Sequence, residues 1–106
     1  MSIENLEVID AISIDKDNNV VLSISDHLEW DEKNEHLVIL QNKINLYLNA
    51  IESGDLYKHY PKAQDRDIVI NIVSKFPPNN DGHLFLRKVK DILNSSGYNF
   101  SFENIK

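Results

Sequence analysis

Hydrophobic and polar residues alternate along four stretches of the chain, and this pattern indicates β-strands. Residues 8–14 and 20–25 flank an Asp- and Asn-rich segment at 15–19, so together they predict a β-hairpin. Residues 68–73 predict a third strand and residues 98–103 a fourth. Each stretch carries apolar side chains on one face, which is typical of a sheet covered on one side.

Between the second and third strands the hydrophobic period changes to that of a helix, from about residue 32 to residue 53. Asp31 is the expected N-cap of this helix, and Gly54 is expected to end it in the left-handed conformation. The residues that follow one helical stripe are Leu37, Leu40, Ile44, Tyr47, Leu48 and Ile51.

A second helix is predicted to begin at Asp81 and to end at Gly97. Gly54, Gly82 and Gly97 are the three glycines of the chain, and we expect all three to mark helix ends. The residues expected to face the core from this helix are Phe85, Val89, Ile92 and Leu93.

The predicted order of elements is ββαβαβ, with no linker that would divide residues 1–106 into two domains. One apolar sheet face and two amphipathic helices are satisfied by a two-layer sandwich. We therefore expect a single α/β domain of the α+β type, with a four-stranded mixed sheet and both helices on one face. The pattern does not set the strand order.

The chain has 106 residues, no cysteine and a net charge of −6. The absence of cysteine excludes disulfides, thiolate nucleophiles and cysteine-ligated metals. Charge is uneven, because residues 1–56 carry −9 and residues 57–106 carry +3. An acidic first half argues against nucleic acid as the main partner and is compatible with a basic protein. The first residues lack a signal-peptide pattern, and no apolar run suits a membrane span, so we expect a cytoplasmic protein without a membrane partner.

Residues 26–31, Asp-His-Leu-Glu-Trp-Asp, place the only Trp and several acids at a strand-to-helix junction. Such junctions often expose working side chains, and Trp is common among the residues that dominate binding energy. Alternatively, Trp30 packs over the edge of the sheet, and its presence then requires no binding partner. The candidate interaction surface consists of Glu29, Trp30, Asp31, Glu32 and Glu35.

A metal site is the alternative interpretation of this junction. His27, Asp31 and His36 could bind zinc if the junction folded back on the helix start, and a zinc-bound water could serve hydrolysis. No other catalytic set is visible: the sequence has neither a G-x-S-x-G elbow nor a glycine-rich phosphate loop. We therefore expect no cofactor and assign no catalytic residue.

Four segments of the chain resemble a family of small bacterial cytosolic proteins classed as a domain of unknown function. The segments are VIDAI at 8–12, DHLEWD at 26–31, HL at 36–37 and ESGDLY at 52–57. The resemblance covers nearly the whole chain and implies stand-alone, single-domain proteins of about this size. It carries over no catalytic or binding residues.

Three functions remain open from the sequence. The preferred hypothesis is a non-enzymatic module that binds or regulates a basic protein. The second is a small metal-dependent hydrolase that uses His27, Asp31 and His36. The third is a homodimer, formed through a strand edge or through the spare apolar face of the first helix, with no other partner.

Overall fold

The computed structural model of the protein describes residues 9–105. The elements in chain order are β1 (Ala11–Ile14), β2 (Val20–Asp26), α1 (Glu35–Glu52), α2 (Asp55–His59), the 3-10 turn η1 (Pro61–Ala63), β3 (Ile68–Ser74), α3 (Asn80–Ser95) and β4 (Asn99–Asn104). Apart from the short α2 and η1, this is the predicted ββαβαβ order. Residue 8 of the first predicted strand lies outside the described residues.

The four strands form one mixed sheet in the order β1-β2-β3-β4. β1 and β2 pair antiparallel as the predicted hairpin, while β2, β3 and β4 run parallel to one another. Parallel pairing places the carboxyl ends of these three strands along one end of the sheet. The residues at these ends are Asp26, Ser74 and Asn104.

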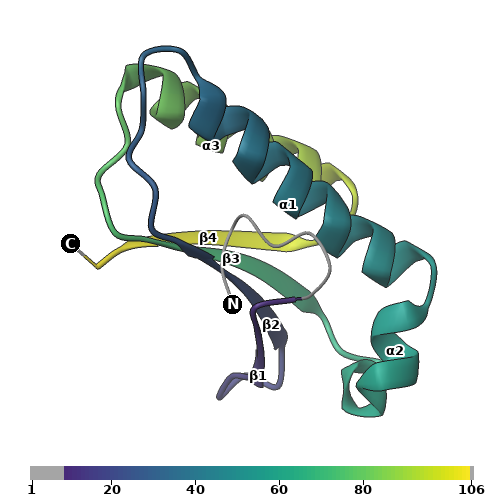
Figure 1. Cartoon of the computed structure of the whole chain (residues 1–106). Helices are drawn as coiled ribbons and strands as arrows, with labels where there is room; N and C mark the ends of the chain where they lie inside the picture. Colours follow the sequence, from purple (N-terminus) through teal and green to yellow (C-terminus); the bar gives the residue numbers. More distant parts are fainter. Residues whose placement is uncertain (1–8, 106) are drawn as a thin grey trace.

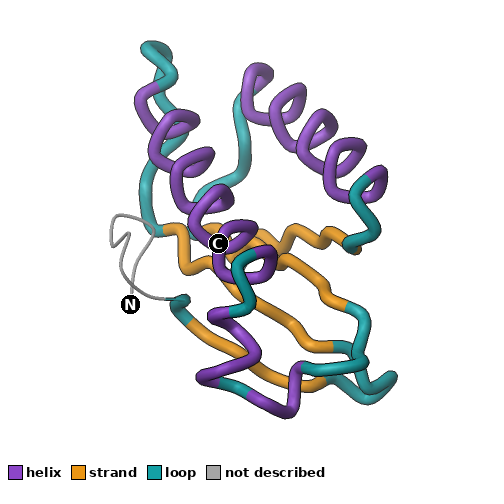
Figure 2. The backbone as a smooth tube through the Cα atoms, turned by 90° about the vertical axis from the view of Figure 1, so that its right-hand side faces the viewer, coloured by secondary structure: helices purple, strands orange, loops and turns teal. Residues whose placement is uncertain are grey.

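Both long helices lie on the same face of the sheet, as Figures 1 and 2 show, so the predicted two-layer α+β architecture is confirmed. The core is the space between the layers. This space is filled by alternate side chains of β2 and β3 from the sheet and by the buried stripe of α1. The fully or nearly fully buried apolar residues of these three elements are Val20, Leu22, Ile24, Leu40, Ile44, Tyr47, Ile51, Ile68, Ile70 and Ile72. Within residues 9–105, no helix is both long and apolar enough to cross a membrane.

The buried face of α3 differs from the predicted face. Leu86, Val89 and Leu93 are buried, whereas Ile92 keeps 61% of its surface exposed and Phe85 is only partly buried. The rotation of α3 is explained at its first turn, where Gly82 lies directly against the ring of Trp30. This contact turns the stripe 82, 86, 89 and 93 toward the sheet and leaves Ile92 on the outer side.

The helix ends agree only in part with the sequence prediction. Gly54 and Gly97 follow α1 and α3 with φ of 86° and 91°, in the left-handed region as expected. The cap of α3 is Asn79 rather than Asp81, because the Asn79 side chain accepts a hydrogen bond from the Gly82 N–H at 2.7 Å. Gly82 therefore lies inside the helix and does not mark an end, and the prediction for it was wrong.

Candidate functional site

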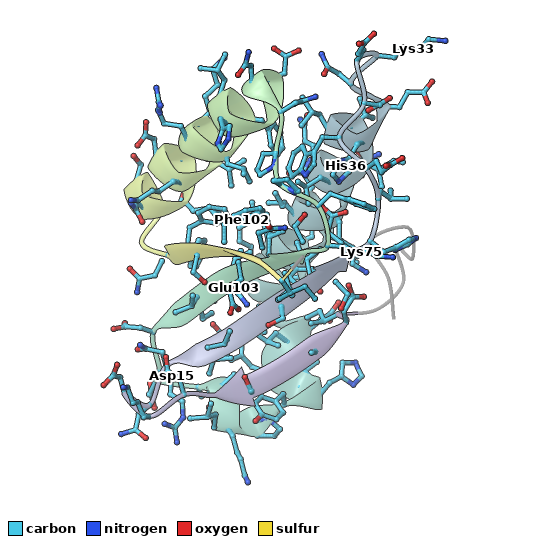
Figure 3. The ribbon with its side chains drawn as sticks, turned by 90° about the vertical axis from the view of Figure 1, so that its left-hand side faces the viewer. Asp15, Lys33, His36, Lys75, Phe102 and Glu103 are labelled. Atoms are coloured by element: carbon cyan, nitrogen blue, oxygen red, sulfur yellow. The ribbon has the colours of Figure 1, made fainter. Side chains whose placement is uncertain are left out.

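The segment 27–34 connects β2 to α1 and lies at the carboxyl ends of the parallel strands, beside the connection from β3 to α3. In open α/β sheets this end is the usual place for ligands. Figure 3 looks onto this side of the molecule, with Lys33 at the tip of the segment and His36 and Phe102 nearer the sheet. The candidate surface predicted from sequence belongs to this segment and to the first turn of α1.

A buried Asp–His pair joins the end of β2 to the start of α1. His36 Nε2 lies 2.8 Å and 2.7 Å from the two carboxylate oxygens of Asp26, and both side chains are almost completely buried. Asp26 also accepts the backbone N–H of Leu28 at 3.2 Å. His36 Nδ1 is buried without a hydrogen-bond partner within the described residues. The pair therefore ties the two layers together and offers no accessible proton-transfer group.

Trp30 packs into the fold and covers this pair. Its ring meets the His36 ring edge-on at a centroid distance of 4.2 Å and the Phe102 ring at 6.4 Å. Its indole N–H donates to the Phe76 carbonyl at 3.1 Å. A Cβ added to Gly82 would lie 2.6 Å from the ring, so only glycine fits beneath it. Trp30 thus fastens the segment to α3 and β4.

Asp31 organises the start of α1 from outside the helix. The predicted helix start near residue 32 was wrong, because Asn34 adopts a left-handed conformation with φ of 61° and the helix begins at Glu35. The Asp31 carboxylate accepts the backbone N–H groups of His36 at 3.0 Å and Glu35 at 3.2 Å. These bonds, that of His36 first, lower the pKa of Asp31 below its ordinary value. The N-cap of α1 is therefore Asn34 and not the predicted Asp31, although the Asp31 carboxylate still accepts N–H groups of the first turn from farther upstream.

The remaining three residues of the predicted surface, Glu29, Glu32 and Glu35, are exposed. None of the three carboxylates forms a salt bridge within residues 9–105. We call these three residues the acidic loop, although only Glu29 and Glu32 lie in the connection and Glu35 is the first residue of α1. Of the five predicted surface residues, the structure therefore presents three to solvent and uses Trp30 and Asp31 mainly to hold the backbone.

The structure does not assemble the alternative metal site. His36 turns Nε2 into the core toward Asp26, whereas His27 is exposed. Asp31 directs both carboxylate oxygens at backbone N–H groups. Across residues 9–105, no three His, Cys, Asp or Glu side chains are grouped so that they could hold a metal ion.

A second buried network, which was not predicted from the sequence, lies farther along α1. Lys43 Nζ is 2.9 Å from the Asp10 carboxylate, and both side chains are completely buried. The Tyr47 hydroxyl donates to the Ser23 carbonyl at 2.6 Å and accepts the Asp10 N–H at 2.8 Å. Asp10 also accepts the Ser25 N–H at 2.9 Å. A signal existed, because Lys43 lies three residues after Leu40 and four before Tyr47, so it falls on the same helical face as members of the predicted stripe.

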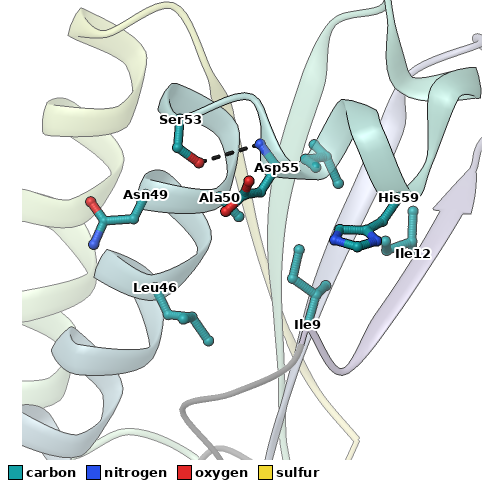
Figure 4. Close-up of a pocket in the computed structure, with 9 residues that line it drawn as sticks. Ile9, Ile12, Leu46, Asn49, Ala50, Ser53, Asp55 and His59 are labelled. Atoms are coloured by element: carbon teal, nitrogen blue, oxygen red, sulfur yellow. Dashed lines mark hydrogen bonds between the residues drawn. The ribbon is translucent and has the colours of Figure 1, made fainter.

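Two apolar grooves flank α1. One, of about 600 Å³, lies on the β1 side and is lined by residues that include Ile9, Ile12 and Leu46 (Figure 4). The other, of about 280 Å³, lies between α1 and α3, with Leu48 on one wall and Ile92 on the other. Neither groove contains the Asp–His pair.

Comparisons with known proteins place the whole chain in a family but do not name an activity. No curated protein and no solved structure matches it. A family of unknown function matches residues 1–106, which is the family relationship expected from the sequence. The chain therefore belongs to the family of unknown function DUF6572.

Proposed function

We propose that the protein is a non-enzymatic binding module that recognises a basic protein through the acidic loop. The observation that carries the proposal is the set of three exposed carboxylates, Glu29, Glu32 and Glu35, with no salt bridge inside the described chain. Exposed carboxylates without an ion-pair partner attract cationic partners and raise the rate of encounter.

The backbone beneath the acidic loop is fixed before any partner arrives. Trp30 binds it to the Phe76 carbonyl, and Asp31 binds it to the first turn of α1. A preorganised loop loses little conformational entropy on binding, so more of its interaction energy appears as affinity. This arrangement supports a recognition surface.

The chemistry of the buried groups favours binding over catalysis. A general base must come within hydrogen-bond reach of its substrate. The side chains of Asp26 and His36 are almost completely buried beneath Trp30, and those of Asp10 and Lys43 are completely buried. These pairs are therefore suited to holding α1 on the sheet.

The test compares two triple charge reversals with equal effect on net charge. The loop variant is E29K/E32K/E35K, and the control is D17K/E52K/D91K, which changes three exposed acids outside the loop. Binding to an array of Lys- and Arg-rich peptides is measured at low and physiological salt. Exposed ion pairs contribute about 0.2–1 kcal/mol each, so loss of three pairs plus new repulsion predicts at least about tenfold weaker binding by the loop variant.

The control variant should bind the same peptides within about threefold of the wild-type protein. Equal weakening of both variants would show that only net charge matters, and the proposed role of the acidic loop would then be wrong. Circular dichroism of both variants checks that the fold is retained.

A further inference from the structure

β1 forms one edge of the sheet, and β2 is its only strand neighbour within residues 9–105. Figure 3 shows it as the outermost strand, below β2. Its sequence, Ala-Ile-Ser-Ile, includes neither a charged residue nor a proline, which are the residues that commonly block edge-to-edge pairing. The opposite edge strand, β4, carries the exposed carboxylate of Glu103. β1 is therefore the edge with fewer side chains that prevent pairing.

The hydrogen bonds of the hairpin show which backbone groups of β1 face the free edge. The Asp15 N–H donates to the Asn19 carbonyl at 3.0 Å, so it points across the hairpin. The N–H of Val20, which is paired with Ile14, donates on the β3 side, away from β1. These directions alternate along an antiparallel strand. The N–H and C=O groups of Ile12 and Ile14 therefore point outward, where no other strand of the described chain pairs with them.

The side chains of the same two residues lie on the helix face of the sheet. Ile12 and Ile14 are paired with Leu22 and Val20, which are fully buried in the core, yet both isoleucines are only partly buried themselves. The groove of about 600 Å³ beside β1 is lined by Ile12 together with Leu46 of α1 (Figure 4). An occupant that satisfies both the free backbone edge and this groove is an extended strand with apolar side chains on one face.

We propose that this occupant is the β1 strand of a second copy, so that two chains form a symmetric dimer with one continuous sheet. Antiparallel pairing centred on Ser13 places Ile12 of each copy opposite Ile14 of the other. Both residues direct their N–H and C=O groups outward, so each such pair can exchange two hydrogen bonds. Side chains of opposite residues lie on one face, so the isoleucines of both copies meet on the groove side. β1 is thus complementary to itself, as a two-fold interface requires.

A single cysteine at position 13 tests both the pairing and its register. Ser13 is exposed, and its backbone groups point toward β2, so the two copies of residue 13 form a non-hydrogen-bonded pair with Cα atoms about 4.5 Å apart. This separation suits a disulfide. The natural chain has no cysteine, so S13C carries one thiol. With oxidised glutathione, most of the S13C chain should form a covalent dimer on a non-reducing gel.

The matched control is S25C, which places the thiol on an exposed serine of β2 on the same sheet face. In the proposed dimer the two β2 strands are three strand spacings apart, about 14 Å, which is too far for a disulfide. S25C should therefore form at least about tenfold less covalent dimer than S13C. Equal cross-linking of the two variants would reflect random collision, and the inference would then be wrong.

Sedimentation equilibrium measures the association without a cross-link. The paired strands and the groove should bury less than the roughly 1,200 Å² of stable complexes, so we expect a dissociation constant in the micromolar range. The apparent mass of the wild type should rise with concentration from 12.3 kDa toward twice that value. S13K opposes two lysines across the two-fold axis and should raise the dissociation constant at least about fivefold, whereas S25K should not.

Two results of this measurement would overturn the inference. One is a wild-type mass that stays at 12.3 kDa up to about 1 mM. The other is a dimer that S13K and S25K weaken equally, because the two chains would then meet through a different surface. Neither result bears on the acidic loop, which the inference does not use.

Discussion

Replacing Gly82 by alanine tests how tightly Trp30 is held against α3. A Cβ at position 82 would lie 2.6 Å from Trp30 Cε3, 2.9 Å from Trp30 Cζ3 and 3.0 Å from Pro78 Cβ. Both neighbours are stiff, because the indole N–H is bonded to the Phe76 carbonyl and Pro78 is a ring. The new methyl group can therefore enter only if the indole moves away from α3.

The free energy of unfolding of G82A combines two opposing effects. Overpacking at a filled contact costs about 1–3 kcal/mol. Alanine is favoured over glycine in a helix by up to about 1 kcal/mol, and less in the first turn, where Gly82 lies. We therefore expect G82A to destabilise the wild-type protein by about 0.5–2 kcal/mol. In a W30A background the clash with the indole is absent and only the 3.0 Å contact with Pro78 remains, so the same substitution should cost about 1 kcal/mol less than in the wild-type background.

Urea unfolding of the wild type, G82A, W30A and the double variant measures both values, with circular dichroism as a common probe. Trp30 is the only tryptophan, so its fluorescence in the wild type and G82A also reports displacement of the ring. The expected result is a smaller loss of stability in the W30A background than in the wild type. If G82A changed stability equally in both backgrounds and left the emission maximum unmoved, the close contact would be wrong.

Three further predictions concern the buried groups and the cap. In K43M the Asp10 carboxylate remains buried without its ion-pair partner, and urea unfolding should show a loss of about 3–5 kcal/mol; a loss below about 1 kcal/mol would contradict this. Y47F leaves the Ser23 carbonyl and the Asp10 N–H without their side-chain partner and should cost about 2–4 kcal/mol. Burial raises the pKa of Tyr47 above its ordinary value, so stability should fall as pH rises past that value, and Y47F should remove the last phenol ionisation seen by absorbance. The pKa of Asp31 is lowered in the fold, so its charged form stabilises the folded protein fully above the ordinary pKa of 3.8. This stabilisation is lost as the pH falls through the lowered pKa. The stabilities of the wild type and D31N, measured in acid titrations, should therefore converge in that range.

The architecture was predictable because local patterns carry most of it. Alternation along residues 20–25 and 68–73 identified the two central strands, and the stripe through Tyr47 identified α1. Both patterns arise because one face of the element is buried, so every residue of the element is apolar or polar according to the face on which it lies. Strand order has no such signal, since it depends on which edges meet after folding.

The details of the helices were less predictable because tertiary contacts set them. The contact between Gly82 and Trp30 joins positions 52 residues apart and rotates α3, so that Ile92 points outward. The cap of α3 moved from Asp81 to Asn79 because both types of side chain can cap, and only the local backbone selects one.

The candidate site was predictable in composition but not in its roles. The acids around Trp30 were visible, yet their separation into exposed Glu29 and Glu32 and structural Asp31 depends on where the backbone turns at Asn34. The buried pair of Asp10 and Lys43 was hidden because each residue is common on surfaces, and only their meeting across 33 positions makes burial possible.

The parallel register between β2 and β3 also constrains how the chain folds. Val20 pairs with Ile68, so the first contact of the central strands closes a loop of 48 residues that contains α1. Such long-range pairing is slow because chain entropy is lost before the contact forms. The β1-β2 hairpin and α1 can form from local contacts, and the bond between Tyr47 and Ser23 joins them directly, but β3 completes the sheet beneath α1. During synthesis, β2 and α1 therefore emerge before β3, the second central strand, and β4, which ends at Asn104, completes the sheet last.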